Sequence, residues 1–153
     1  MPNQGKIKRI LVAIDNSGYK DRIIGLAFDL ASSLNAELYA IHVIDRASMG
    51  AVGDLIGYYR GGKVEVYQEE LKKQGEKLLD EVKAPAEHLG IKVTSEVVVA
   101  SSVAGTLIDY ARDHNIDLIL IGTKGITGMQ RFLMGSVANN VIANAHCPVL
   151  AVR

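Results

Sequence analysis

The chain has 153 residues, 17 basic and 17 acidic residues, and 48% hydrophobic residues. This composition excludes a disordered chain, and the length is typical of one domain with a substantial core. The formal net charge of zero gives no overall attraction to nucleic acid or to anionic lipid. No apolar stretch is long enough for a membrane span or a signal peptide, and the single cysteine, Cys147, cannot form an internal disulfide. We therefore expect a cytoplasmic protein without a nucleic-acid or membrane partner.

The N-terminal part of the chain predicts a strand, a helix and a second strand. Residues 9–14 form a near-continuous apolar run that is typical of a buried strand, and residues 15–18 are turn and capping residues that end it. Residues 21–34 repeat apolar residues at helical spacing, and residues 37–43 predict the second strand. The helix is expected to bury five apolar residues, namely Ile23, Ala27, Leu30, Ala31 and Leu34.

The middle of the chain begins with a glycine-rich segment. Five of the 17 residues from 46 to 62 are glycine, which predicts a long mobile connection that is either a plain loop or a lid over a ligand. Residues 64–89 predict a charged helix that Pro85 kinks or interrupts and Gly90 ends. The inward side of this helix is expected to carry Leu71, Leu78, Leu79 and Val82.

The C-terminal part predicts three more strands separated by two helices. Residues 91–99 alternate apolar with polar residues at first, which indicates an exposed or edge strand. Ser101 or Ser102 caps the next helix, whose inward face is expected to hold Val103, Leu107, Ile108 and Ala111. A strand at 117–121, a helix at 137–144 and a strand at 148–152 complete the chain. Five strands with intervening helices predict a parallel α/β sheet.

A glycine-rich segment, residues 122–136, joins the fourth strand to the last helix. Glycine allows backbone N–H groups to approach a ligand closely, and a helix N-terminus presents unpaired N–H groups and a partial positive charge. This arrangement suits phosphate oxygens. The segment matches neither the Walker A motif nor G-x-G-x-x-G, so by physics alone a phosphate site and an ordinary strand-to-helix loop both remain open.

The spacing G-x2-G-x9-G-S, formed by Gly122, Gly125, Gly135 and Ser136, resembles the nucleotide-binding motif of the universal stress protein family. The likeness covers nearly the whole chain, 1–153, as one domain. It implies an open doubly wound five-stranded parallel sheet of order 3-2-1-4-5 with helices on both faces. Ligands of such sheets bind beyond the carboxyl ends of the strands, where the strand order reverses. The order 3-2-1-4-5 brings the polar loop after the first strand and the glycine-rich loop after the fourth to that point.

The resemblance also implies ATP as the ligand, with magnesium held mainly by phosphate oxygens and water. It assigns the adenine and ribose to the ends of the first two strands and the phosphates to the glycine-rich loop. Asp15 is expected in the nucleotide site, although capping of the next helix is an alternative. Lys124 and Arg131 either balance phosphate charge or are solvated cations. The site residues are then Ala13, Ile14, Asp15, Val43, Gly122, Lys124, Gly125, Arg131, Gly135, Ser136 and Val137.

Two classes of function follow from the resemblance. The first is an ATP-binding regulatory or switch protein of the stress response, acting on an unknown protein partner. The second is an enzyme that hydrolyses ATP or transfers its phosphoryl or adenylyl group; the sequence offers no convincing general base or arginine finger, so turnover would be slow. A scaffold with an empty site is a third alternative. Family members dimerise through the last strand, so residues 149–152, an apolar edge, are expected to form a homodimer interface.

Overall fold

The fold comes from a computed structural model that describes residues 5–47, 64–123 and 135–153. Strands and helices alternate along the chain, which confirms the predicted α/β class. The strands are β1 (Arg9–Ala13), β2 (Glu37–Asp45), β3 (Val93–Ala100), β4 (Leu118–Gly122) and β5 (Val149–Val152). The helices are α1 (Lys20–Leu34), α3 (Val64–His88), α4 (Val103–Asp113) and α5 (Ser136–Asn144).

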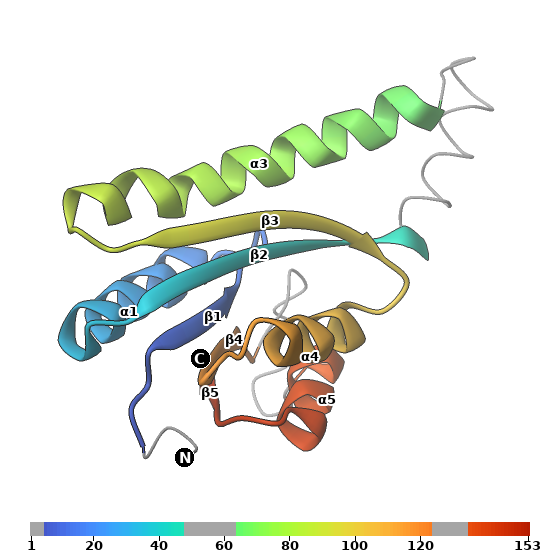
Figure 1. The fold of residues 1–153 in the computed structure, drawn as a ribbon. Coiled ribbons are helices and arrows are strands. Elements are labelled where there is room, and N and C mark those ends of the chain that lie inside the picture. The colour runs from blue at the N-terminus through green and yellow to red at the C-terminus, as the bar shows by residue number, and fades with distance from the viewer. Residues whose placement is uncertain (1–4, 48–63, 124–134) are drawn as a thin grey trace.

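The five strands form one parallel sheet of order β3-β2-β1-β4-β5, which confirms the predicted topology (Figure 1). The central strand β1 pairs with β2 on one side and with β4 on the other, where Ile10 lies opposite Leu118. Both faces of β1 are covered, so its run of Ile10, Leu11 and Val12 is fully buried. The switch point of the sheet therefore lies between β1 and β4.

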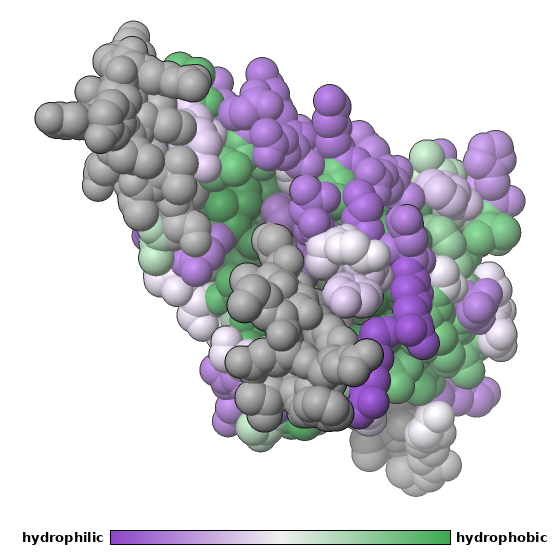
Figure 2. Space-filling model, turned by 180° about the vertical axis from the view of Figure 1, so that it is seen from behind, coloured by the Kyte–Doolittle hydropathy of each residue, from purple (hydrophilic) through white to green (hydrophobic). Residues whose placement is uncertain are grey.

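The helices cover both faces of the sheet (Figure 1). Helices α1 and α3 pack on one face and α4 and α5 on the other, so two separate apolar clusters form. Successive side chains of a strand point to opposite faces, and β1 accordingly sends Ile10 and Val12 to the α1/α3 cluster and Leu11 to the α4/α5 cluster. Hydrophilic residues cover much of the outer surface in the view from behind (Figure 2).

One expectation for α1 is wrong, and one of the two alternatives for α3 is wrong. Leu34 lies in the last turn of α1 and is 41% exposed, while Ile24 of the same helix is buried instead. Pro85 does not interrupt α3, which continues to His88. Pro85 is exposed, so the backbone N–H that proline lacks is missing on the solvent side of the helix. Val82 and Ala86 are buried, and their packing against the sheet keeps the helix in place.

The ends of two helices are as expected. Gly90 has φ +70° and follows α3, where its N–H donates to Glu87 O at 3.1 Å and the Ile91 N–H donates to Ala86 O at 2.9 Å. This pair of bonds is the Schellman arrangement that glycine favours. The Ser102 side chain caps α4 and accepts a bond from the Gly105 N–H.

Part of the prediction for residues 46–62 lies outside the described residues. Arg46 and Ala47, the two residues of this range that the structure describes, are helical and follow β2 directly. The predicted edge strand is confirmed, because β3 is an outer strand of the sheet and leaves Thr94 and Glu96 exposed. Of the described helices, none combines the length and the apolar character needed to cross a lipid bilayer.

Candidate functional site

A cavity of about 800 Å³ lies at the carboxyl end of the sheet. Its floor is formed by the ends of β1, β2 and β4, and its walls by the N-terminal ends of α1, α4 and α5 and by residues 67–81 of α3. The volume falls in the range of small-molecule sites. The cavity occupies the switch point of the sheet, where open α/β folds bind their ligands.

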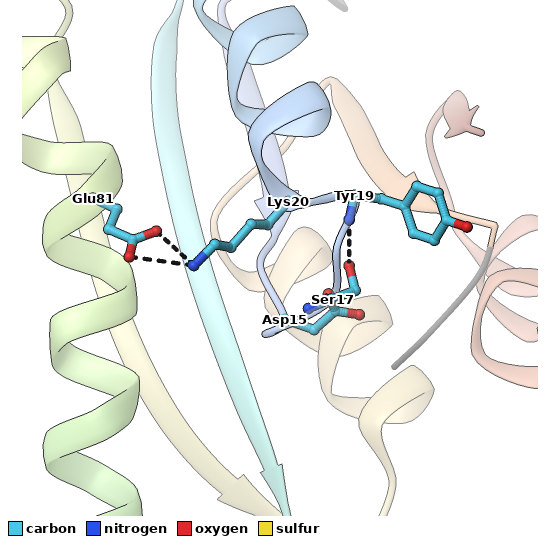
Figure 3. A network of polar contacts seen from close by, with 5 residues as sticks. All are labelled: Asp15, Ser17, Tyr19, Lys20 and Glu81. Atoms are coloured by element: carbon cyan, nitrogen blue, oxygen red, sulfur yellow. Dashed lines mark hydrogen bonds and ion pairs between the residues drawn. The ribbon is translucent and has the colours of Figure 1, made fainter. Parts of the chain in front are cut away.

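The loop from β1 to α1 contributes Asp15 to the cavity. The Asp15 Oδ1 atom accepts a hydrogen bond of 3.0 Å from the Ser17 N–H, and the Ser17 Oγ atom accepts one of 3.3 Å from the Tyr19 N–H (Figure 3). Asp15 therefore stabilises a turn and does not cap α1, whose N-cap residue is Tyr19, so the capping alternative is wrong. The turn holds the half-buried Asp15 carboxylate at the cavity wall.

The end of β2 contributes Val43 and the preceding His42. The His42 Nδ1 atom lies 2.8 Å from the carbonyl oxygen of Ile14, and the Ile14 N–H donates to Ile41 O at 2.9 Å. These two bonds connect β1 and β2 just after Ala13, the last residue of β1 that is paired in the sheet. They hold Ile14, a predicted adenine contact, at the cavity.

The two described ends of the glycine-rich segment lie side by side. The Thr123 N–H donates to Val152 O at 2.9 Å, and the Gly135 N–H donates to Thr123 O at 2.7 Å. Helix α5 begins at Ser136, and its N-cap residue, Gly135, has no side chain to cap it. Ser136, Val137 and Ala138 line the cavity, so the uncapped N-terminus of α5 faces the space available to a ligand.

Eight of the eleven predicted site residues line this one cavity, although they come from four separate segments of the chain. They are Ala13, Ile14, Asp15, Val43, Gly122, Gly135, Ser136 and Val137. The other three, Lys124, Gly125 and Arg131, lie outside the described residues. The sequence therefore predicted a group of residues that the fold does bring together.

The side of the cavity formed by α3 carries polar residues that the sequence analysis missed. The Lys20 Nζ atom of α1 lies 3.0 Å and 3.2 Å from the two carboxylate oxygens of Glu81 in α3 (Figure 3). Gln74 and Lys77 also line this side. A helix that is charged over most of its surface hides such residues, and only Gly75, a glycine inside a helix, could have indicated a close approach there.

Cys147 lies away from the cavity lining and is half-buried. Burial raises the pKa of its thiol, and the Asp117 carboxylate adds to this effect. A raised pKa lowers the thiolate fraction and with it the reactivity of the thiol. Within residues 5–47, 64–123 and 135–153, no group of three His, Cys, Asp or Glu side chains could hold a metal ion.

The parallel sheet, its order and the cavity at its switch point define an open doubly wound α/β domain. The model of the universal stress protein family matches residues 6–153, and the chain belongs to this family. Universal stress protein MJ0531 of Methanocaldococcus jannaschii is 38% identical over 95% of this chain and 82% of its own length. Universal stress protein YxiE of Bacillus subtilis is 32% identical over 95% of this chain and 98% of its own.

Solved structures share the fold. Hypothetical protein MJ0577 superimposes with a TM-score of 0.82 at 24% identity, over 96% of both chains. A universal stress protein from Archaeoglobus fulgidus, solved in complex with dAMP, has a TM-score of 0.64 at 22% identity over 97% of this chain and 99% of its own. Another universal stress protein, solved in complex with cAMP, has a TM-score of 0.66 at 21% identity over 97% and 98% of the two chains.

Proposed function

We propose that this protein binds ATP in the cavity at the switch point and acts as a nucleotide-dependent regulatory protein of the stress response. The observation that carries the proposal is the convergence of eight predicted site residues on one cavity that also holds an uncapped helix N-terminus. Nucleotide complexes of two structural relatives, one with dAMP and one with cAMP, support a nucleotide as the class of ligand.

The phosphates are assigned to the N-terminus of α5. A helix N-terminus carries about half a positive charge and several N–H groups without an intrahelical partner. At α5 these groups belong to Ser136, Val137 and Ala138, which line the cavity, and the N-cap residue, Gly135, has no side chain to cap them. Phosphate oxygens are ligands for such groups whatever base the nucleotide carries. Lys124 and Arg131 belong to the same proposal as sources of compensating positive charge.

The nucleoside is assigned to the ends of β1 and β2. One Asp15 oxygen accepts the Ser17 N–H, and the carboxylate has further lone pairs for a ribose hydroxyl. Ala13, Ile14 and Val43 offer apolar surface and strand-end backbone groups to the adenine ring. Magnesium accompanies the phosphates and is held by their oxygens and by water, as is usual for nucleotide-bound magnesium. The proposal includes a cytoplasmic location, where ATP is available to the site.

The proposal also includes a homodimer through β5. This strand is an outer strand of the sheet and consists of four apolar residues, of which Leu150 is 38% exposed. An apolar edge strand is a template for pairing with another chain, and pairing about a two-fold axis sets the two β5 strands antiparallel. Light scattering at micromolar concentration should give the mass of a dimer. A monomeric mass would reject this part of the proposal.

Calorimetric titration of ligand-free protein tests the nucleotide site. Mg·ATP should bind, and adenosine should bind more weakly because it lacks the groups that α5 recognises. Gly125→Val should abolish most of the difference between the two ligands by blocking the phosphates. Mass spectrometry of ligand released from denatured protein gives an independent check. The assignment would be contradicted if the wild type did not bind millimolar Mg·ATP, or if the wild type and Gly125→Val bound it equally well.

A further inference from the structure

The cavity has two sides that differ in their relation to the predicted site. Ala13, Gly122 and the first turn of α5 lie at β1, β4 and the α4/α5 face. The opposite side is formed by α3 and by His42, whose ring lies against α3 at Gly75. His42 is half-buried and lines the cavity between Val43 and the end of β1, so a nucleotide at those strand ends would lie beside its ring.

The hydrogen bond to Ile14 determines which nitrogen of a neutral His42 ring carries the proton. A carbonyl oxygen can only accept, so the Nδ1 atom, 2.8 Å from Ile14 O, carries the proton. The Nε2 atom of a neutral imidazole then has an unprotonated lone pair. Among the described residues, the His42 ring makes one hydrogen bond, at Nδ1, and no described residue donates a hydrogen bond to Nε2.

Packing holds the ring in this orientation. A Cβ atom added at Gly75 would lie 2.8 Å from His42 Cδ2 and 3.1 Å from Val97 Cγ2, so glycine is what allows α3 to approach this closely. The ring is therefore held at Nδ1 by the Ile14 carbonyl and at Cδ2 by α3. An acceptor held in place by its surroundings discriminates between ligands better than one on a mobile side chain.

We propose that His42 Nε2 is a specificity-determining hydrogen-bond acceptor that receives an N–H or O–H of the nucleotide. The inference rests on the proposed function and adds a residue to it. Two groups of ATP have the required chemistry, the 6-amino group of adenine and the ribose hydroxyls. A nucleotide with a carbonyl at position 6 of the base would instead set an acceptor against an acceptor and leave both unpaired.

The test combines variants of the protein with variants of the ligand. His42→Asn retains an amide N–H near the position of Nδ1–H and removes the acceptor at the end of the ring. Its affinities for ATP, ITP, 2′-deoxy-ATP and 3′-deoxy-ATP are compared with those of the wild type by calorimetry. The preference of the wild type for ATP over one of these analogues should fall by about two- to tenfold in the variant, the range for one neutral hydrogen bond.

His114→Asn is the matched control. The His114 Nδ1 atom also lies close to a backbone carbonyl, that of Tyr110 at 2.9 Å, but His114 does not line the cavity. All ligand preferences should remain as in the wild type. A reduced preference over ITP identifies the adenine amino group as the donor, and a reduced preference over a deoxy analogue identifies the corresponding hydroxyl.

A measurement on the wild type keeps the inference testable if His42→Asn does not fold. The ¹⁵N chemical shift of an imidazole nitrogen reports hydrogen bonding directly, so saturation with Mg·ATP should move the Nε2 resonance of His42 and leave that of His114 in place. ATP binding with no change in the His42 Nε2 shift, or with identical ligand preferences in His42→Asn and wild type, overturns the inference while the proposed function stands. Absence of ATP binding overturns both.

Discussion

Helices α4 and α5 lie on the same face of the sheet and share one apolar cluster, but their N-termini are built differently (Figure 1). At α4 the Ser102 Oγ atom accepts the Gly105 N–H at 3.0 Å, and the Thr106 hydroxyl donates to Ser102 O at 2.7 Å. At α5 the corresponding residue is Gly135, which has no capping side chain.

The difference matches what each helix presents to the cavity. Helix α4 contributes apolar side chains, Val103 and Leu107, while Ser102 satisfies an N–H of its own first turn. Helix α5 contributes its first turn itself, with N–H groups that its N-cap residue, Gly135, has no side chain to bond. Relative to a capping side chain, glycine at the N-cap costs a helix only about a few tenths of a kcal/mol, which a bound anion would readily offset.

The largest effect is expected from an acidic cap on α5. Gly135→Asp should weaken ATP binding by roughly 3 kcal/mol, because the carboxylate occupies the N–H groups and repels phosphate. Gly135 has φ −60° and ψ 156°, which any residue adopts, so the backbone itself does not oppose the change. Calorimetric titration with Mg·ATP gives the affinity of the variant.

Gly135→Ala is the control for the added Cβ atom, which would lie 3.3 Å from Thr123 O and require a small shift. We expect it to lose much less affinity than Gly135→Asp. Adenosine, which has no phosphate, should bind wild type and Gly135→Asp alike. An equal loss for ATP and adenosine would mean that the variant damages the cavity as a whole and would contradict the phosphate assignment.

A second prediction concerns Asp15, which serves both the turn and the proposed ligand. Asp15→Ala should weaken ATP binding by about 1–3 kcal/mol, the range for a hydrogen bond to a charged group. It should also destabilise the protein, because the Ser17 N–H loses its acceptor. Asp15→Asn keeps an oxygen for Ser17 and removes the charge, so its melting temperature should stay near that of the wild type while its affinity falls. Full affinity in both variants would remove Asp15 from the site.

A third prediction concerns the side-chain cap of α4. Ser102→Ala removes the side-chain cap and should lower the free energy of unfolding by about 1 kcal/mol, or the melting temperature by roughly 2–4 °C for a domain of this size. Affinity for ATP should not change, because Ser102 is not among the residues that line the cavity. A loss of affinity without a loss of stability would mean that the α4 N-terminus also serves the ligand.

The sequence predicted the sheet and most of the cavity for physical reasons that can be stated. Strands buried on both faces, such as β1, have apolar runs that no loop shares, and glycine, serine and aspartate mark the strand ends. The strand order followed from the position of two polar loops together with the family resemblance, and β1 does lie between β2 and β4. The eight cavity residues followed once those loops were placed at one edge of the sheet.

What the sequence could not predict depends on contacts between distant elements. His42 has a structural bond to Ile14 and a face on the cavity, and the alternation of β2 residues indicates only which face of the sheet it occupies. The pair of Lys20 and Glu81 joins residues 61 positions apart, and no local pattern marks it. The predicted burial of Leu34 was wrong because helical spacing identifies the inward face of a helix, and not the point along the helix where the sheet beneath it ends.

The smallest expected effect concerns Tyr110, near the C-terminal end of α4. Its hydroxyl is buried and has no hydrogen-bond partner in the described parts of the chain, and its ring stacks on that of His114 with centroids 3.8 Å apart. Burial raises the pKa of Tyr110 to about 12, with further contributions from Glu96 and Tyr39. Because an unfolded tyrosine loses its proton near pH 10, the unfolded state binds fewer protons than the folded state between pH 10 and pH 12.

The contribution of Tyr110 to stability is therefore fully present below pH 10 and falls as the pH rises toward 12. Tyr110→Phe should leave stability at pH 7 unchanged or raised by roughly 0.5 kcal/mol, since the buried hydroxyl makes no hydrogen bond to the described residues. Urea unfolding of the wild type and Tyr110→Phe from pH 8 to pH 11 gives the difference between their free energies of unfolding. The contributions of the other titrating groups cancel in this difference. Stability should fall less steeply in the variant above pH 10, while ATP affinity at pH 7 stays the same. Parallel pH profiles would show that the pKa of Tyr110 is not raised in the folded protein, as for a hydroxyl in contact with water. A variant markedly less stable at pH 7 would show that the hydroxyl makes a hydrogen bond.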